Sequence, residues 1–141
     1  MRRDVLIVTV VVAAVLVIAV AAVFVSSLSP AHAEIAAVST DKDIYHSHET
    51  MKIAVMVRSS GQMDNTTVKI EGIEDKNGRM RLSHEIPANI SSDQTIVNYD
   101  YELPACSKCA GLDPGSYQFN VTLERNGIPI SNATHSIRIE Q

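Results

Sequence analysis

The hydrophobic residues of this chain follow two different patterns, one near the N-terminus and one in the rest of the sequence. From Val5 to Val25 every residue is apolar except Thr9. A helix of this length is about 31 Å long, close to the roughly 30 Å hydrocarbon core of a bilayer. We therefore predict that residues 5–25 form one transmembrane helix and that the membrane is a partner of this chain.

Residues 34–141 instead alternate apolar and polar side chains with a period of two, which is typical of strands with one buried face. From Met51 to Ser59, for example, every odd position from 51 to 57 is apolar. The pattern predicts seven strands, over residues 34–40, 51–59, 68–75, 80–86, 95–103, 117–123 and 133–139. Short strands without crossover helices predict an all-β, antiparallel sandwich.

Turn residues separate several of the predicted strands. Gly72 shifts the alternation within the third strand, as a β-bulge would do. Charged residues in and after this strand, including Asp75, are expected on a solvated face. Two Asn-Gly dipeptides are typical of tight hairpin turns and join predicted strands: Asn77-Gly78 and Asn126-Gly127.

Charges beside the apolar segment predict its orientation. Arg2 and Arg3 precede the segment and serines follow it, so the positive-inside rule leaves the N-terminus in the cytoplasm and residues 34–141 outside. Ala31-His32-Ala33 is also a signal-peptidase pattern, and cleavage after Ala33 would give a secreted protein. The apolar stretch is longer than a usual signal-peptide core, which favours a retained signal anchor in the cytoplasmic membrane.

Size and charge exclude several classes of function. The chain has 141 residues and a net charge of −4. Beyond residues 1–33, which hold the helix and a short polar linker, residues 34–141 suffice for one domain and are too few for a multidomain enzyme. No basic stripe is present to bind nucleic acid. The remainder is too apolar for a disordered chain.

The segment 112–117, Leu-Asp-Pro-Gly-Ser-Tyr, resembles the tyrosine corner of fibronectin type III and immunoglobulin-like domains. In that motif the tyrosine hydroxyl bonds to the backbone a few residues upstream and pins the chain where it crosses between sheets. The resemblance therefore implies a structural role for Leu112, Pro114, Gly115 and Tyr117.

The segment 40–45, Thr-Asp-Lys-Asp-Ile-Tyr, followed by residues 51–55, is similar to the beginning of macroglobulin-like and related surface domains of bacteria and archaea. Together the two resemblances imply a sandwich of the immunoglobulin or fibronectin type III kind. Immunoglobulin domains carry a cysteine two residues after the corner tyrosine, where this chain has Phe119. The core is therefore expected to lack an intersheet disulfide.

Four N-x-S/T sequons suggest a glycosylated exterior. Their asparagines are Asn65, Asn89, Asn120 and Asn132. By the strand pattern, Asn120 and Asn132 point outward from strands and the other two lie in loops. The alternative is that all four are ordinary polar residues of turns and faces.

Cys106 and Cys109 form a C-x-x-C pair between the fifth and sixth predicted strands. Outside the cell, two thiols this close are expected to oxidise to a local disulfide. As an alternative, these cysteines and the H-x-H pair His46 and His48 would together supply four ligands for copper or zinc. No βαβ pattern accompanies the cysteines, which disfavours a thioredoxin-like site.

The sequence has none of the spaced motifs expected of a catalytic site, such as G-x-S-x-G, H-E-x-x-H or a phosphate-binding glycine loop. We expect a non-enzymatic, membrane-anchored extracellular binding, adhesion or scaffold protein without a cofactor, whose partner is an envelope protein or glycan. The copper- or zinc-handling domain is the alternative. A subunit of a membrane complex also fits, because the alanines at positions 13, 14, 19, 21 and 22 permit close helix packing.

Overall fold

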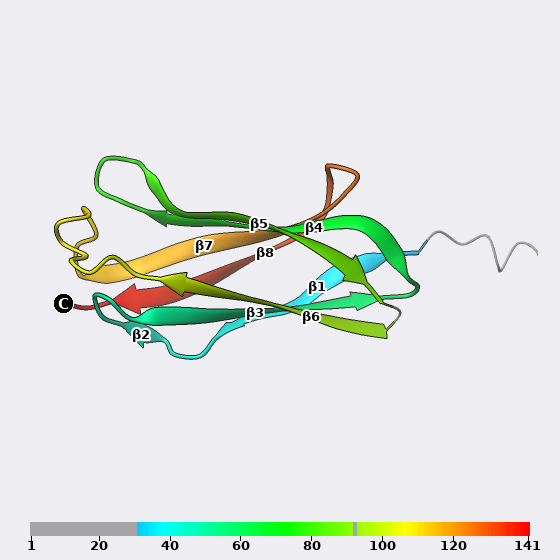
Figure 1. Ribbon diagram of the computed structural model, residues 1–141, viewed down its shortest axis with the longest axis horizontal. Coiled ribbons are helices and arrows are strands. Elements are labelled where there is room, and N and C mark those ends of the chain that lie inside the picture. The colour runs from blue at the N-terminus through cyan, green and yellow to red at the C-terminus, as the bar shows by residue number, and fades with distance from the viewer. Residues whose placement is uncertain (1–30, 92) are drawn as a thin grey trace, which may run out of the picture. The chain divides into compact units, whose positions relative to one another are not determined.

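The computed structural model describes residues 31–91 and 93–141, which form eight strands in two sheets (Figure 1). The strands are β1 (Ala33–Thr40), β2 (Ile44–Tyr45), β3 (Thr50–Ser59), β4 (Met63–Glu74), β5 (Met80–Ile90), β6 (Asp93–Glu102), β7 (Gly115–Arg125) and β8 (Ile128–Ile139). The described part of the chain is therefore all-β, as the alternation predicts.

The two sheets face each other as the layers of a sandwich. The three-stranded sheet has the order β1-β3-β6, and the five-stranded sheet has the order β2-β8-β7-β4-β5. Neighbouring strands are antiparallel except β2 and β8, which run parallel. The prediction of seven antiparallel strands is thus wrong by one strand, because two-residue β2 is too short for any alternation to show.

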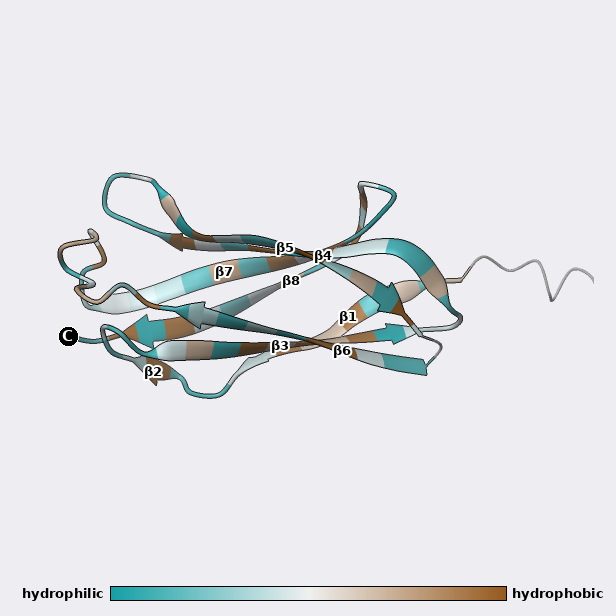
Figure 2. Ribbon diagram, viewed as in Figure 1, coloured by the Kyte–Doolittle hydropathy of each residue, from teal (hydrophilic) through white to brown (hydrophobic). Residues whose placement is uncertain are grey.

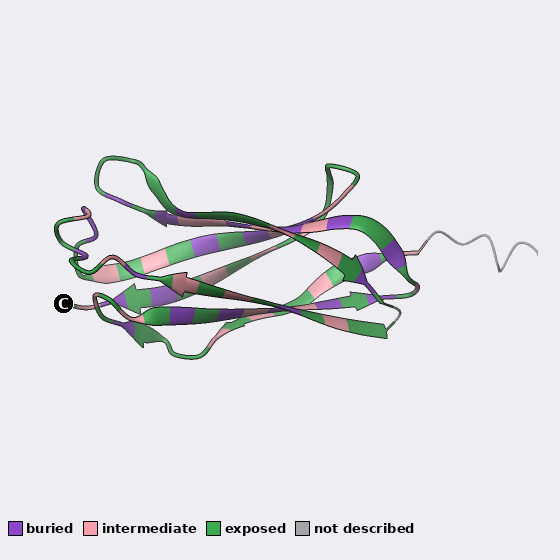
Figure 3. Cartoon of the chain, viewed as in Figure 1, coloured by how far each residue is buried: buried purple, intermediate pink, exposed green. Residues whose placement is uncertain are grey.

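The core lies between the sheets and is built by the predicted alternation. Figure 3 shows buried and exposed residues alternating along β3 and β7. On β3 the odd positions from 51 to 57 are buried, and Phe119, Val121 and Leu123 of β7 are buried as well. Full burial of a side chain of this size stabilises the fold by roughly 1.5–3 kcal/mol.

The bulge expected at Gly72 is absent, because the pairs Gly72↔Leu82 and Glu74↔Met80 keep one register between β4 and β5, but the buried positions of β4 do change phase there. Gly72 has a φ of +153° and Ile73 has a φ of 52°, so Ile73 becomes the next buried residue of β4. Gly72 also lies directly against β7, where a Cβ atom would be 2.5 Å from the Cα of Phe119. Glycine is therefore required both by the backbone conformation and by the close approach of the two strands.

The two Asn-Gly dipeptides behave differently. Asn126 and Gly127, with φ of 52° and 75°, are the whole connection between β7 and β8. Two consecutive positive φ values are those of a type I′ turn, so this tight hairpin is confirmed. Asn77 and Gly78 instead lie inside a longer connection of residues 75–79 between β4 and β5.

Asp75 explains the longer connection and corrects the prediction of a solvated carboxylate. Its side chain is buried, and its Oδ1 accepts hydrogen bonds from the backbone N–H groups of Asn77 at 2.8 Å and Arg79 at 3.1 Å. Its Oδ2 pairs with the guanidinium of Arg81 at 2.7 Å. The bonds from the backbone, with help from Arg81, lower the pKa of Asp75.

The transmembrane helix predicted over residues 5–25 lies outside the described residues, as do Arg2 and Arg3. Among residues 31–91 and 93–141 there is no helix with the length and apolar character needed to cross a bilayer.

Candidate functional site: the outer face of the three-stranded sheet

The side of the three-stranded sheet that points away from the core forms a candidate binding surface, which we refer to as the outer face. The strand register sets its residues in rows across β1, β3 and β6. From one end to the other, the rows are Lys52 with Asp100; Ser39, Ala54 and Asn98; Ala37, Met56 and Ile96; and Glu34, Arg58 and Gln94.

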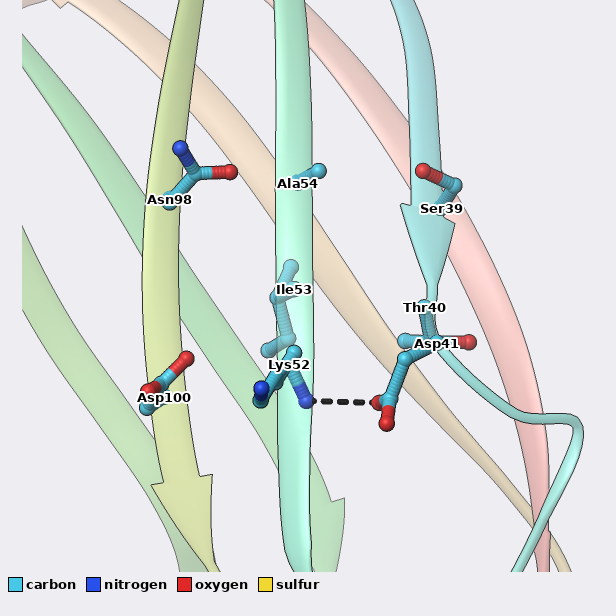
Figure 4. Close-up of a pocket in the computed structure, with 8 residues that line it drawn as sticks. All are labelled: Ser39, Thr40, Asp41, Lys52, Ile53, Ala54, Asn98 and Asp100. Atoms are coloured by element: carbon cyan, nitrogen blue, oxygen red, sulfur yellow. Dashed lines mark hydrogen bonds between the residues drawn. The ribbon is translucent and has the colours of Figure 1, made fainter.

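The outer face has a hollow at its second row, where the side chains are small. Figure 4 shows Asn98, Ala54 and Ser39 side by side at one level of the sheet. Because Ala54 and Ser39 are short, a hollow of about 280 Å³ lies over them. Asp41, Lys52 and Asp100 line its lower part. The hollow therefore has a floor of short side chains and a charged end.

The carboxylate of Asp41 is held in place at the edge of this hollow. Its Oδ1 accepts a hydrogen bond from the backbone N–H of Lys52 at 2.8 Å (Figure 4) and another from the hydroxyl of Tyr45 at 2.7 Å. The bond from Tyr45, with that from Lys52, lowers the pKa of Asp41. Burial, with the bond to Asp41, raises the pKa of Tyr45 to about 12. Asp41 therefore presents a fixed negative charge to anything bound in the hollow.

The third row makes the centre of the outer face apolar. Met56 of β3 lies between Ala37 and Ile96, and Ile96 is 52% exposed although it is a large hydrophobic residue. On either side lie opposite charges that face each other across strands, Lys52 with Asp100 and Glu34 with Arg58. An apolar centre within a charged rim is the composition of protein–protein interfaces.

A second hollow of about 270 Å³ lies at the opposite end of the same face. His32, Glu34, Arg58 and Asp93 contribute ionisable groups, and Ser59 and Ser60 contribute hydroxyls. Both ends of the outer face are thus polar and concave, with the apolar row between them.

The four sequon asparagines all belong to strands of the five-stranded sheet. Asn120 and Asn132 are exposed on β7 and β8, and the Oδ1 of Asn120 accepts a hydrogen bond from Thr134 at 2.7 Å. Asn65 and Asn89 are exposed too, but they lie within β4 and β5 rather than in loops. That prediction is wrong because both strands extend further than the clear part of their alternation.

Cys106 and Cys109 are joined as a disulfide in the connection between β6 and β7. Both cysteines are exposed, whereas Ser107 between them is buried. The hydroxyl of Ser47 donates to the Oγ of Ser107 at 2.9 Å and accepts the N–H of Ser107 at 3.0 Å. The loop is therefore attached to the β2–β3 connection through serine rather than through cysteine.

The structure does not support the alternative of a copper or zinc site. Although the Ser47–Ser107 contact brings the two loops together, both sulfur atoms are in the disulfide. His46 lies 3.7 Å from Glu49, and His48 lies 3.7 Å from Glu102, both measured from the imidazole Nδ1 to a carboxylate oxygen. Across the described ranges, His, Cys, Asp and Glu side chains form no group of three suited to a metal ion.

Tyr117 donates its hydroxyl to the backbone carbonyl of Asp113 at 2.7 Å. The bond returns to the backbone four residues upstream, just before β7 begins. Leu112 is buried in the core, whereas Pro114 is exposed and Gly115 opens β7. The segment thus ties the start of β7 to the loop that precedes it.

Comparison with known proteins supports the fold and nothing finer. No family model matches the sequence, and no curated protein matches it. A CARDB domain from Pyrococcus furiosus is similar with a TM-score of 0.52 and 13% identity, over 77% of this chain and 93% of that one. The C-terminal domain of wzt is similar with a TM-score of 0.58 and 9% identity, over 77% of this chain and 74% of that one.

A larger enzyme contains a similar domain. A cycloisomaltooligosaccharide glucanotransferase from Paenibacillus matches with a TM-score of 0.59 and 19% identity, over 79% of this chain but 15% of the enzyme. These likenesses identify an immunoglobulin-like β-sandwich that different proteins use as a module. At such identities they do not carry any activity over to this chain.

Proposed function

We propose that this chain is a non-enzymatic, membrane-anchored domain outside the cytoplasmic membrane, which binds an envelope protein through the outer face of its three-stranded sheet. The observation that carries the proposal is the combination on that face of the hollow over Ala54 and the apolar row of half-buried Met56 and exposed Ile96. Packed side chains of a partner would fill the hollow and cover Ile96, and the charges at both ends would set the register.

The position of the sequons supports this choice of face. Asn89, Asn120 and Asn132 lie on β5, β7 and β8, so glycans there would cover the five-stranded sheet and leave the outer face bare. None of the residues that form the rows of the outer face is aromatic. A flat apolar row without an aromatic platform suits a protein partner better than a sugar ring, and we therefore propose a protein.

Contacts near residue 33 support a retained anchor over a cleaved signal. Ala33 is buried and pairs with Ser59 at the start of β1. The carbonyl oxygen of His32 accepts a hydrogen bond from the N–H of Ser60 at 2.9 Å. A chain cut after Ala33 would lose these contacts. The resemblance of residues 40–45 and 112–117 to macroglobulin-like and fibronectin type III domains of surface proteins supports the same placement.

Site-specific photocrosslinking in native membranes tests the proposal. A photoreactive amino acid at Ile96 of the full chain is expected to crosslink to a protein, because Ile96 lies at the centre of the outer face. The matched control carries the same amino acid at Gln118, which is exposed on β7 of the five-stranded sheet, and we expect no crosslink there. Equal crosslinking at the two positions would contradict the choice of face, and a polysaccharide adduct at position 96 would replace the protein partner with a glycan.

A further inference from the structure

The two hairpins of the five-stranded sheet differ at their tips: one tip is charged and the other is apolar. The β4–β5 connection, residues 75–79, is Asp-Lys-Asn-Gly-Arg, and its tip is charged. The β7–β8 hairpin continues from its Asn-Gly turn into Ile128, Pro129 and Ile130, all exposed, with Ile128 at 66% and Ile130 at 37%. Figure 2 shows the hydrophobic colour on this hairpin where it extends beyond the sandwich. We refer to residues 126–130 as the apolar tip.

The fold does not need isoleucine at the apolar tip. The type I′ turn is specified by Asn126 and Gly127 alone, and the shift in the β7–β8 register between Leu123 and Glu124 puts an extra residue on the β8 side. Polar residues would serve there equally well and would remain solvated. Two exposed aliphatic side chains that the turn does not require therefore leave this hairpin available for a contact outside the sandwich.

The apolar tip lies at the end of the sandwich where the described chain begins, at Ala31. At this end the N–H of Asn126 donates to the carbonyl of Asn65 at 3.0 Å, and Asn65 lies near the start of β4. Ser59 and Ser60, which precede β4, donate hydrogen bonds to the carbonyl oxygen of His32, and Gly61 lies beside Ala31. The charged β4–β5 hairpin lies at the other end of the sandwich (Figure 1).

The length of the linker brings this end close to the bilayer. If the apolar segment ends at Val25, residues 26–30 are the whole connection to Ala31, and five extended residues span at most about 18 Å. The interfacial layer on each side of a bilayer accounts for about 5–8 Å of that distance. The hairpin, which rises sideways from the five-stranded sheet near this end (Figure 1), can therefore reach the headgroups if the sandwich lies tilted toward the bilayer.

We propose that the apolar tip inserts Ile128 and Ile130 into the interfacial layer of the membrane that anchors the chain. The proposal rests on the proposed membrane anchor. The tip has aliphatic side chains for the acyl boundary, and its proline limits its flexibility. The contact would hold the sandwich at a defined angle to the bilayer, with the β4–β5 end and the disulfide loop pointing away.

Single-tryptophan variants of the full chain test the insertion, because the native sequence has no tryptophan. Ile128→Trp reports on the apolar tip. Met80→Trp is the matched control, since Met80 is 61% exposed beside the β4–β5 hairpin. Both variants are made in a host without N-glycosylation, because a glycan on Asn65 would lie beside the tip. They are then reconstituted into phosphatidylcholine vesicles with and without brominated acyl chains. Ile130→Trp is a second probe, and circular dichroism verifies that each variant folds.

We expect brominated lipid to reduce the emission of Ile128→Trp at least about twofold, with a blue-shifted maximum, and to leave Met80→Trp unchanged. No quenching at positions 128 and 130, or equal quenching at position 80, overturns the insertion. A blue shift without quenching at 128 overturns it too, because the side chain then packs on protein. Flotation of the vesicles distinguishes the failure of one proposal from the failure of both. A chain that floats with the vesicles but is not quenched contradicts only the insertion of the tip. A chain that does not float contradicts the membrane anchor as well.

Discussion

At the scale of single residues, Gly72 is the position where the fold is least tolerant of an added side chain. A Cβ there would lie 2.5 Å from the Cα of Phe119 and 2.6 Å from the carbonyl oxygen of Gln118, and both are backbone atoms that cannot rotate away. The φ of +153° adds a conformation that other residues rarely adopt. The positive φ values of Gly72 and Ile73 also set which side chain of β4 is buried next.

We expect Gly72→Ala to lower the free energy of unfolding by roughly 3 kcal/mol or more, because strain and overpacking act together. Guanidinium unfolding of the full chain in detergent, followed by circular dichroism, measures this loss. Gly115→Ala is the control, since nothing lies within 4 Å of a Cβ at that position, and it should change stability little. A Gly72→Ala protein as stable as the control would show that β4 and β7 can separate without cost.

At the scale of elements, the β4–β5 connection depends on one buried carboxylate. Asp75 accepts two backbone N–H groups of its own turn and pairs with Arg81. Because these bonds lower its pKa below the ordinary value of 3.8, the unfolded chain binds a proton at higher pH than the folded chain does. The stability that Asp75 contributes is therefore present above about pH 4 and is lost as the pH falls through the lowered pKa.

We expect Asp75→Asn to lower the melting temperature at pH 7 and to flatten its decrease between pH 5 and pH 2, since the amide does not titrate. Thermal unfolding at several pH values measures both effects. Part of the acid slope should remain, because bonds from Tyr45 and Lys52 lower the pKa of Asp41 in the same direction. An unchanged slope in the variant would mean that Asp75 is not the group whose protonation destabilises the turn.

Single residues protect β5, the open edge of the five-stranded sheet, against pairing with an added strand. On β5, Pro87 has no N–H to offer another strand, and the carbonyl of Arg81 accepts the hydroxyl of Tyr101 at 3.1 Å. The rings of His84 and Tyr99 stack with centroids 4.3 Å apart across the gap between β5 and β6. Together these features leave little free backbone on β5 for an added strand.

The alternation of apolar and polar residues predicted the strands well wherever a strand had one solvent-exposed face and one buried face. It found β3 and β7 because their apolar residues recur at every second position. It missed β2, which has two residues, and in the predicted strand 80–86 the apolar phase that buries Leu82 also includes Met80, which is 61% exposed. Near Met80 the strand leaves the sandwich, so the period continues where no core remains to bury the side chain.

The candidate site was not predictable in the same way, because it depends on register between strands far apart in sequence. Ser39, Ala54 and Asn98 are ordinary outward residues of three segments, and only the pairings of β1 with β3 and β3 with β6 make them one row. The signal that the sequence does contain is the small size of Ser39 and Ala54. It becomes informative once the strands are paired.

At the scale of the whole molecule, the two sheets divide the surface between sequons and the proposed binding face. A glycan on the outer face should therefore block the partner, whereas the natural sequons should not. The substitution Asp100→Thr provides such a glycan, because it turns the Asn-Tyr-Asp sequence of residues 98–100 into an N-x-T sequon at Asn98, beside the hollow. We expect this variant, expressed in the native host, to lose the partner in pull-down from solubilised membranes.

Asp100→Thr made in a host without N-glycosylation is the control for the lost carboxylate and should bind more of the partner than the glycosylated form does. Asn120→Gln with Asn132→Gln removes two natural sequons from the five-stranded sheet and should retain the partner. If mass spectrometry shows the new glycan at Asn98 and the partner still copurifies, the outer face is not the binding surface.

The pairing of β1 with β3 also has a mechanical consequence. If the membrane holds residue 31 and a partner pulls on the sandwich, tension enters through β1 along the strand direction. The β1–β3 ladder extends antiparallel from Ala33↔Ser59 to Thr40↔Ile53, and its hydrogen bonds lie perpendicular to that pull. The load is then shared across the ladder in shear instead of opening one bond at a time. Behind it, the parallel pairing of β2 with β8 holds the next segment to the C-terminal strand, so unravelling from the attached end would have to break this pairing as well.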